Sequence, residues 1–213
     1  MRDFASLRAR MVEKQLRRRG IDDERVLAAM GEVPREAFVP RGQRHRAYAD
    51  SALPIAERQT ISQPWVVAAI CQALELNGSG RVLEVGTGSG YSACVLALLA
   101  AEVVSIERHQ ALALAARETL ASLAVTNVEL AIGDGSRGVP ERAPFEAIAV
   151  HAAAPAAPPA LISQLAEGGR LVVPIAGGEE TDLLTLVRRR GSGVETEAIA
   201  PCRFVPLVGD EGF

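Results

Sequence analysis

The sequence lacks an apolar run long enough to cross a membrane. Its longest purely apolar stretch, Ala93 to Ala101, is far shorter than the roughly 18 residues that a transmembrane helix needs. This excludes a membrane-spanning protein. The opening residues, Met1-Arg2-Asp3-Phe4, mix acid and base and contain no apolar core of a secretory signal. We therefore expect a cytoplasmic protein.

Cysteine is also scarce. Cys71, Cys94 and Cys202 lie far apart, and two of them fall within apolar helical patterns. Such spacing is typical of reduced, buried thiols and not of a disulfide framework or a CxxC metal site. We expect no metal centre.

The chain has no excess of positive charge. It contains 23 basic and 26 acidic residues, with a net charge of −3 and a pI of about 5.7. Residues 1–50 hold 12 basic and 8 acidic residues, so the rest of the chain is acidic, with 11 against 18. Nucleic-acid-binding domains usually concentrate basic residues and reach a pI above about 9. Nucleic acid is therefore excluded as a partner.

The first sixty residues predict two short helices and a long loop. Apolar residues recur at near-helical spacing up to Gly20, and a second helix, capped by Asp22 or Asp23, ends before Pro34. From Pro40 to Gln63 no periodicity is visible. A loop of this length is often functional.

After residues 78–80 the pattern alternates between strands and helices. The predicted strands are 81–85, 102–106, 127–132, 145–150 and 170–173, and the predicted helices are 65–76, 89–100, 109–123 and 159–165. This alternation predicts an α/β fold with a doubly wound, mostly parallel sheet. Two strand-like runs around Gly191-Ser192-Gly193 predict an antiparallel hairpin at the sheet edge.

A glycine-rich turn, Gly86-Thr87-Gly88-Ser89-Gly90, follows the first of these strands. Ligands of open parallel sheets bind beyond the carboxyl ends of the strands, where glycine lets the main chain approach them closely. Glu107 ends the next strand, 23 residues after Glu84, where an acid accepts hydrogen bonds from ribose hydroxyls. Together these features predict a nucleoside cofactor. A tight turn with a capped helix is the alternative interpretation.

The charge of Glu84 indicates which cofactor binds. A carboxylate two residues before the first glycine would repel the pyrophosphate of a dinucleotide, but it would attract the sulfonium and ammonium of S-adenosylmethionine (SAM). The GxGxG spacing, in place of GxGxxG, points the same way. We therefore expect SAM.

Two further segments, Thr60-Ile61-Ser62-Gln63-Pro64 and Phe204-Val205-Pro206-Leu207, are more specific than the glycine turn. With them the chain resembles the protein-L-isoaspartate O-methyltransferase (PIMT, or PCMT) family over nearly its whole length. The other matching segments are 10–12, 15–16, 19–21, 33–40, 47–48, 50, 52–55, 84–91, 133–135, 143–145, 164–165 and 168–169. The resemblance implies one Rossmann-like methyltransferase domain, 1–213. It divides into an N-terminal helical cap and substrate loop (1–63), a cofactor-binding core (64–181) and C-terminal edge strands (182–213).

The resemblance also implies the reaction. Family members transfer the SAM methyl group to the free α-carboxylate of an L-isoaspartyl residue in a damaged protein or peptide, and the ester then closes to a succinimide. Such a carboxylate is ionised at neutral pH, so no general base is needed. The enzyme must align the reactants and exclude water.

Site residues carry over from the family by position. Ser62 is implied as the catalytic residue that orients the nucleophile. The implied cofactor-binding residues are Thr60, Ile61, Ser62, Gln63, Glu84, Gly86, Thr87, Gly88, Ser89, Gly90, Glu107, Asp134 and Gly135. The implied substrate-binding residues are Thr60, Ile61, Val205, Leu207 and Val208. Structural alternatives exist: Ser62 as the cap of the helix that starts at Pro64, an ordinary Asp134-Gly135 turn, and an apolar edge strand over 204–208.

Three places depart from the family pattern: Ala56-Glu57-Arg58, Ser136 and His151. The first and last of these bear on substrate choice more than on the cofactor, and we interpret His151 as filling space. Two other functions stay open, namely a family-related methyltransferase acting on a different peptide carboxylate and a SAM-binding adaptor without turnover. A nicotinamide dehydrogenase is a more distant alternative. We expect a monomer that acts on isoaspartyl proteins and peptides.

Overall fold

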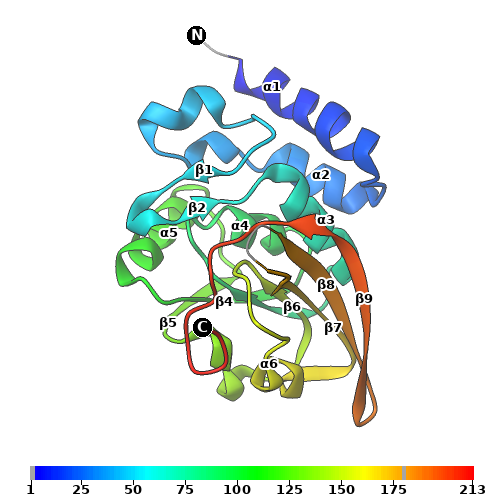
Figure 1. The fold of residues 1–213 in the computed structure, drawn as a ribbon. Helices are drawn as coiled ribbons and strands as arrows, with labels where there is room; N and C mark the ends of the chain where they lie inside the picture. The colour runs from blue at the N-terminus through cyan, green and yellow to red at the C-terminus, as the bar shows by residue number, and fades with distance from the viewer. Residues whose placement is uncertain (1–2, 179–180) are drawn as a thin grey trace.

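The computed structural model describes residues 3–178 and 181–213, and a seven-stranded sheet forms its centre (Figure 1). The strand order is β5-β4-β3-β6-β7-β8-β9. The strands are β3 (Arg81–Val85), β4 (Glu102–Glu107), β5 (Val128–Ile132), β6 (Phe145–Val150), β7 (Leu165–Ala176), β8 (Asp182–Arg190) and β9 (Gly193–Cys202). The five strands from β5 to β7 are parallel, whereas β8 and β9 are antiparallel. The predicted mostly parallel sheet with an antiparallel edge hairpin is confirmed.

Helices cover both faces of the sheet. They are α3 (Pro64–Leu74), α4 (Tyr91–Ala97), α5 (Gln110–Ser122) and α6 (Pro159–Ser163). Successive strand residues point to opposite faces, so along β3 Val82 packs in the cluster with α3 and α4, and Leu83 packs in the cluster with α6. No helix in the described part of the chain is long and apolar enough to cross a bilayer.

The N-terminal cap lies over the first of these faces (Figure 1). Helix α1 (Phe4–Met11) continues as π and 3-10 turns to Arg19 and ends at Gly20, whose φ is 89°. Helix α2 (Glu24–Glu32) is capped by Asp23. The buried side chains of both segments join the same apolar cluster as α3 and α4, so the cap and the core share one interior.

Three segments differ from expectation. The region predicted as an aperiodic loop forms 3-10 turns and a two-stranded sheet of β1 (Leu53–Pro54) and β2 (Thr60–Ile61). Strand β7 is longer than the predicted 170–173. Gly168 and Gly169 resemble a turn in the sequence, but they lie within the strand, at a register shift opposite β6. The edge-strand interpretation of 204–208 is wrong. Strand β9 ends at Cys202, and the chain then crosses to hydrogen-bond with Ala153 through Val205 O and Leu207 N, at 2.8 and 2.7 Å.

Candidate active site

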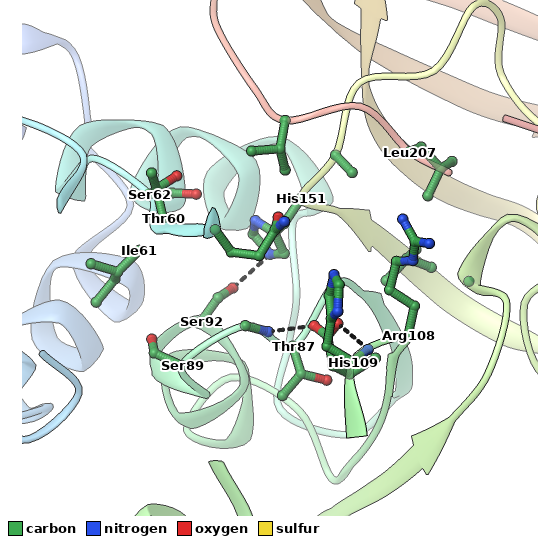
Figure 2. A pocket seen from close by; sticks show the side chains of 18 of the residues that line it. Thr60, Ile61, Ser62, Thr87, Ser89, Ser92, Arg108, His109, His151 and Leu207 are labelled. Carbon is green, nitrogen blue, oxygen red and sulfur yellow. Dashed lines mark hydrogen bonds between the residues drawn. The ribbon is translucent and has the colours of Figure 1, made fainter. Parts of the chain in front are cut away.

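A cavity with about 770 Å³ of empty space lies at the carboxyl ends of β3 and β4 (Figure 2). Most of its lining comes from four segments: the turn between β3 and α4, the end of β4, the end of β2 and the C-terminal segment that follows β9. Residues of α3 and residues that follow β5 and β6 complete it. This is the edge of a parallel sheet at which ligands of open α/β folds bind.

The glycine turn exposes main chain to this cavity. Gly86 and Gly88 have φ values of 92° and 55°, in the left-handed region that side chains rarely adopt. Gly90 has another role: it precedes α4, and a Cβ there would lie 3.1 Å from Ala116 Cβ of α5. Gly90 therefore permits close helix packing and does not line the cavity.

Glu107 is a buried carboxylate at the cavity wall. Its Oε2 accepts a hydrogen bond from Gly88 N at 2.9 Å, and its Oε1 accepts one from His109 N at 2.9 Å. Main-chain donors thus fix the carboxylate, and the acceptor capacity that remains on its oxygens is available to hydroxyl groups of a ligand.

Glu84 lies beneath the cavity and does not line it. The side chain is fully buried, and its Oε2 accepts a hydrogen bond of 2.5 Å from Ser105 Oγ. Burial raises the pKa of Glu84 to about 8, although hydrogen bonds from Ser105 and Ser92 oppose the rise. The carboxyl is therefore mostly neutral at pH 7.

His151 follows β6 and contacts the same buried group. Its Nε2 lies 2.7 Å from Ser92 Oγ and 3.5 Å from Glu84 Oε1. Burial lowers the pKa of His151 to about 4, so this is a contact between neutral groups and not an ion pair. It is not a hydrolase triad either, because serine and acid approach the same ring nitrogen.

Ser62 lies between the end of β2 and the start of α3. The N-cap of α3 is Gln63, which makes no side-chain capping bond. The interpretation of Ser62 as the cap of this helix is therefore wrong. Its half-buried side chain lies at the cavity wall (Figure 2).

A second cavity, with about 800 Å³ of empty space, adjoins the first. Trp65, Phe204, Arg19 and Arg203 are among its lining residues. Four residues line both cavities: Thr60, Ser62, His151 and Val205. We call these four residues the shared wall. His151 therefore does more than fill space, and its place directly after a central strand is the sequence signal that indicates this position.

Asp134 is not among the residues that line the first cavity. It accepts hydrogen bonds from Ser136 N, Ser136 Oγ and Asp210 N, at 2.9, 2.7 and 2.8 Å. Partial burial raises the pKa of Asp134, but these bonds outweigh that effect and hold it below its usual value. Asp134 thus holds the turn at Gly135 and Ser136 and the start of the C-terminal loop. Gly135 does line the cavity, and a Cβ there would lie 2.6 Å from Val85 Cγ1.

The structure thus gathers most of the expected site residues around one cavity. Those that line it are Thr60, Ile61, Ser62, Gly86, Thr87, Gly88, Ser89, Glu107, Gly135, Val205, Leu207 and Val208. Glu84, Gly90 and Asp134 do not line it, and Gln63 lines only the second cavity. In residues 3–178 and 181–213, no group of three or more His, Cys, Asp or Glu could hold a metal ion.

Comparison with known proteins matches the chain to one family. The profile described as protein-L-isoaspartate(D-aspartate) O-methyltransferase covers residues 7–212. Protein-L-isoaspartate O-methyltransferase 1 of Rhodopseudomonas palustris is 53% identical over 211 residues, which cover 99% of this chain and 86% of that protein. The enzyme of Methanoculleus marisnigri is 53% identical over 206 residues, or 97% and 93% of the two chains.

Solved structures show the same similarity. One protein-L-isoaspartate O-methyltransferase superposes with a TM-score of 0.85 at 29% identity, over 96% of this chain and 67% of that one. A second, from Plasmodium falciparum and described as a putative member in complex with S-adenosyl-L-homocysteine, gives a TM-score of 0.79 at 26% identity, over 98% and 99% of the chains.

Proposed function

Because the chain belongs to the protein-L-isoaspartate(D-aspartate) O-methyltransferase family, we propose that its two adjoining cavities hold the cofactor and the substrate of that reaction. The enzyme methylates isoaspartyl residues with SAM and so begins their repair. The observation that carries our assignment is the shared wall, where a donor in one cavity and an acceptor in the other can meet.

The residues of the first cavity fit SAM. Gly86 and Gly88 would admit the ligand against bare main chain, Glu107 would accept hydrogen bonds from ribose hydroxyls, and Gly135 would lie against the adenine. Bound there, the cofactor supplies a methyl group made electrophilic by a sulfonium. The product S-adenosyl-L-homocysteine in the Plasmodium falciparum relative supports this assignment.

The chain itself has to position the acceptor and keep water out. The Ser62 hydroxyl would donate a hydrogen bond to the isoaspartyl α-carboxylate at the shared wall. Ile61, Val205 and Leu207 would give the passage apolar sides. The carboxylate, with a pKa near 4, is ionised at neutral pH, so no side chain has to remove a proton. Alignment and dehydration of the reactants can together supply several kcal/mol of barrier reduction, up to about 7–11.

We further propose that the chain works as a single domain and as a monomer in the cytoplasm. The cap and the core share an apolar cluster, and residues of one chain line both cavities. All three cysteines are free, as is usual in a reducing compartment.

Paired peptides test the substrate assignment. One peptide carries isoaspartate and the other carries ordinary aspartate at the same position, and transfer of labelled methyl from SAM is measured for each. We expect methylation of the isoaspartyl peptide alone. Equal or greater methylation of the aspartyl peptide would identify a different carboxylate as the acceptor, and SAM binding without transfer to either peptide would indicate an adaptor.

A further inference from the structure

The charge that lines the second cavity has one sign. Arg19 and Arg203 line this cavity, and no aspartate or glutamate is among its described lining residues. Trp65 and Phe204 contribute apolar area beside the two guanidinium groups. An anionic group is therefore favoured here over a cationic one.

The charge of Arg19 is already balanced. Its Nη1 lies 2.7 Å from Asp50 Oδ2, and its guanidinium stacks over the Trp65 ring at 4.9 Å from the centroid. Gln63 Nε2 donates to the other carboxylate oxygen of Asp50 at 2.7 Å, which fixes that acid in place. Arg19 therefore forms part of the wall of the second cavity but adds little positive charge that is not already neutralised.

Arg203 is different. It is exposed, and no carboxylate in the described part of the chain lies within 4.0 Å of its guanidinium. Among the described residues, Asp182 pairs in register with Cys202, the residue before Arg203. The carboxylate of Asp182 instead accepts a hydrogen bond from Phe204 N at 2.8 Å. Arg203 thus leaves a positive charge at the second cavity that residues 3–178 and 181–213 do not neutralise.

We propose that Arg203 is a specificity-determining residue that favours isoaspartyl sites flanked by acidic residues. The proposal rests on the function assigned above: if the acceptor carboxylate reaches Ser62 at the shared wall, the neighbouring residues of the peptide lie along the rest of the second cavity, beside Arg203. Because an exposed charge pair contributes little energy, we expect glutamate in place of alanine beside the isoaspartate to raise kcat/KM by about two- to fivefold.

Long-range charge acts in the opposite direction. The whole chain has a net charge of −3, and the part after residue 50 is more acidic still. At a distance this charge favours basic peptides. A preference for acidic flanks would therefore report the local charge in the cavity and not the net charge of the protein.

Three isoaspartyl peptides of equal length test the proposal, with glutamate, alanine or lysine on both sides of the isoaspartate. For the unaltered enzyme we expect kcat/KM to decrease in the order glutamate, alanine, lysine. Arg203→Gln should abolish that order, and Arg203→Lys should retain it. The control is Arg190→Gln, which removes the same charge at the far end of the β8–β9 hairpin, where Arg190 pairs with Gly193 (Figure 1). This variant should keep the order.

Equal rates for the three peptides, or faster methylation of the lysine peptide, would overturn the proposal. It would also fail if the order persisted in Arg203→Gln or disappeared in Arg190→Gln. These outcomes differ from failure of the proposed function, in which none of the three peptides is methylated or the matched aspartyl peptides are methylated equally well.

Discussion

The contribution of Ser62 to catalysis can be measured separately from the stability of α3, the helix that follows it. Because Gln63 is the N-cap of α3 and makes no capping bond through its side chain, removal of the Ser62 hydroxyl costs the helix nothing. We expect Ser62→Ala to lower kcat/KM for an isoaspartyl peptide by about 10- to 100-fold, since misplacement of a reactant by about 1 Å costs up to about 100-fold. The melting temperature should stay constant.

Ser122→Ala is the matched control for this change. Ser122 is exposed at the end of α5, and its hydroxyl donates to Thr119 O. Both kcat/KM and the melting temperature should be unaltered in this variant. An unaltered rate in Ser62→Ala would remove Ser62 from the mechanism.

The turn at Ala56–Arg58 holds two non-glycine residues in the left-handed region. Glu57 and Arg58 have φ values of 55° and 57°, a conformation that costs a side-chain-bearing residue roughly 1–2 kcal/mol. We expect Arg58→Gly to raise the free energy of unfolding by about 1 kcal/mol, as measured in urea. Arg44→Gly, in the 3-10 turn Arg41–Arg46, should lower it. Equal losses in both variants would show that the backbone at Arg58 is not strained.

At the scale of elements, the C-terminal segment closes one side of the first cavity. Leu207 and Val208 line the cavity. In the loop after them, Asp210 N donates a hydrogen bond to the Asp134 carboxylate, and Glu211 N donates one to Ser136 Oγ at 3.0 Å. Gly209 lies against these partners. A Cβ there would lie 1.9 Å from Asp134 Oδ1 and 2.6 Å from Ser136 Oγ.

Gly209→Ala should therefore displace Asp134 and break its bond to Asp210. We expect a loss of about 1–3 kcal/mol in the free energy of unfolding and a higher Kd for SAM, measured by calorimetry. Gly42→Ala is the control, because a Cβ at Gly42 would meet nothing within 4 Å. Unchanged SAM affinity in Gly209→Ala would show that this loop does not shape the cofactor cavity.

Local signals made the elements near the cofactor predictable. The glycines at 86 and 88 meet a backbone requirement that lies within the turn itself, and the alternation of apolar runs marks each parallel strand. The sequence predicts too short a strand β7, because Gly168 and Gly169 are typical of a turn when their pairing with β6 is not known.

The sequence does not show which of the two acids near the strand ends, Glu84 or Glu107, is the more deeply buried. Glu84 pairs in register with Ser105, one step inside the sheet, whereas Glu107 is the last residue of β4. Only this register separates a buried neutral acid from an acid that lines the cavity. The second cavity could not be predicted at all, because segments around Arg19, Ala52 and Arg203 meet there through tertiary packing.

At the scale of the whole molecule, the buried acid makes stability depend on pH. Folded Glu84 keeps its proton up to about pH 8, whereas the unfolded chain releases it near pH 4.5. Stability therefore falls as the pH rises between these values. His151 acts in the opposite sense and at lower pH: the unfolded chain protonates it near pH 6.5 and the folded protein near pH 4, so stability falls on acidification through that range.

Glu84 is therefore the main group of this pair to change stability between about pH 6.5 and 8. In urea titrations over that range we expect the free energy of unfolding of the unaltered protein to fall by about 1 kcal/mol per pH unit relative to Glu84→Gln, which carries no titratable proton. Parallel curves for the two proteins would mean that Glu84 is ionised in the folded state.

The meeting of two ligands at the shared wall is most directly tested by a crystal structure of the protein with S-adenosyl-L-homocysteine and an isoaspartyl peptide. The account predicts the cofactor sulfur in the cavity bounded by Gly86 and Glu107. It also predicts the peptide carboxylate in the cavity bounded by Trp65 and Phe204, with Thr60, Ser62, His151 and Val205 around the line that joins them. A peptide bound elsewhere, or a carboxylate beyond reach of the Ser62 hydroxyl, would contradict it.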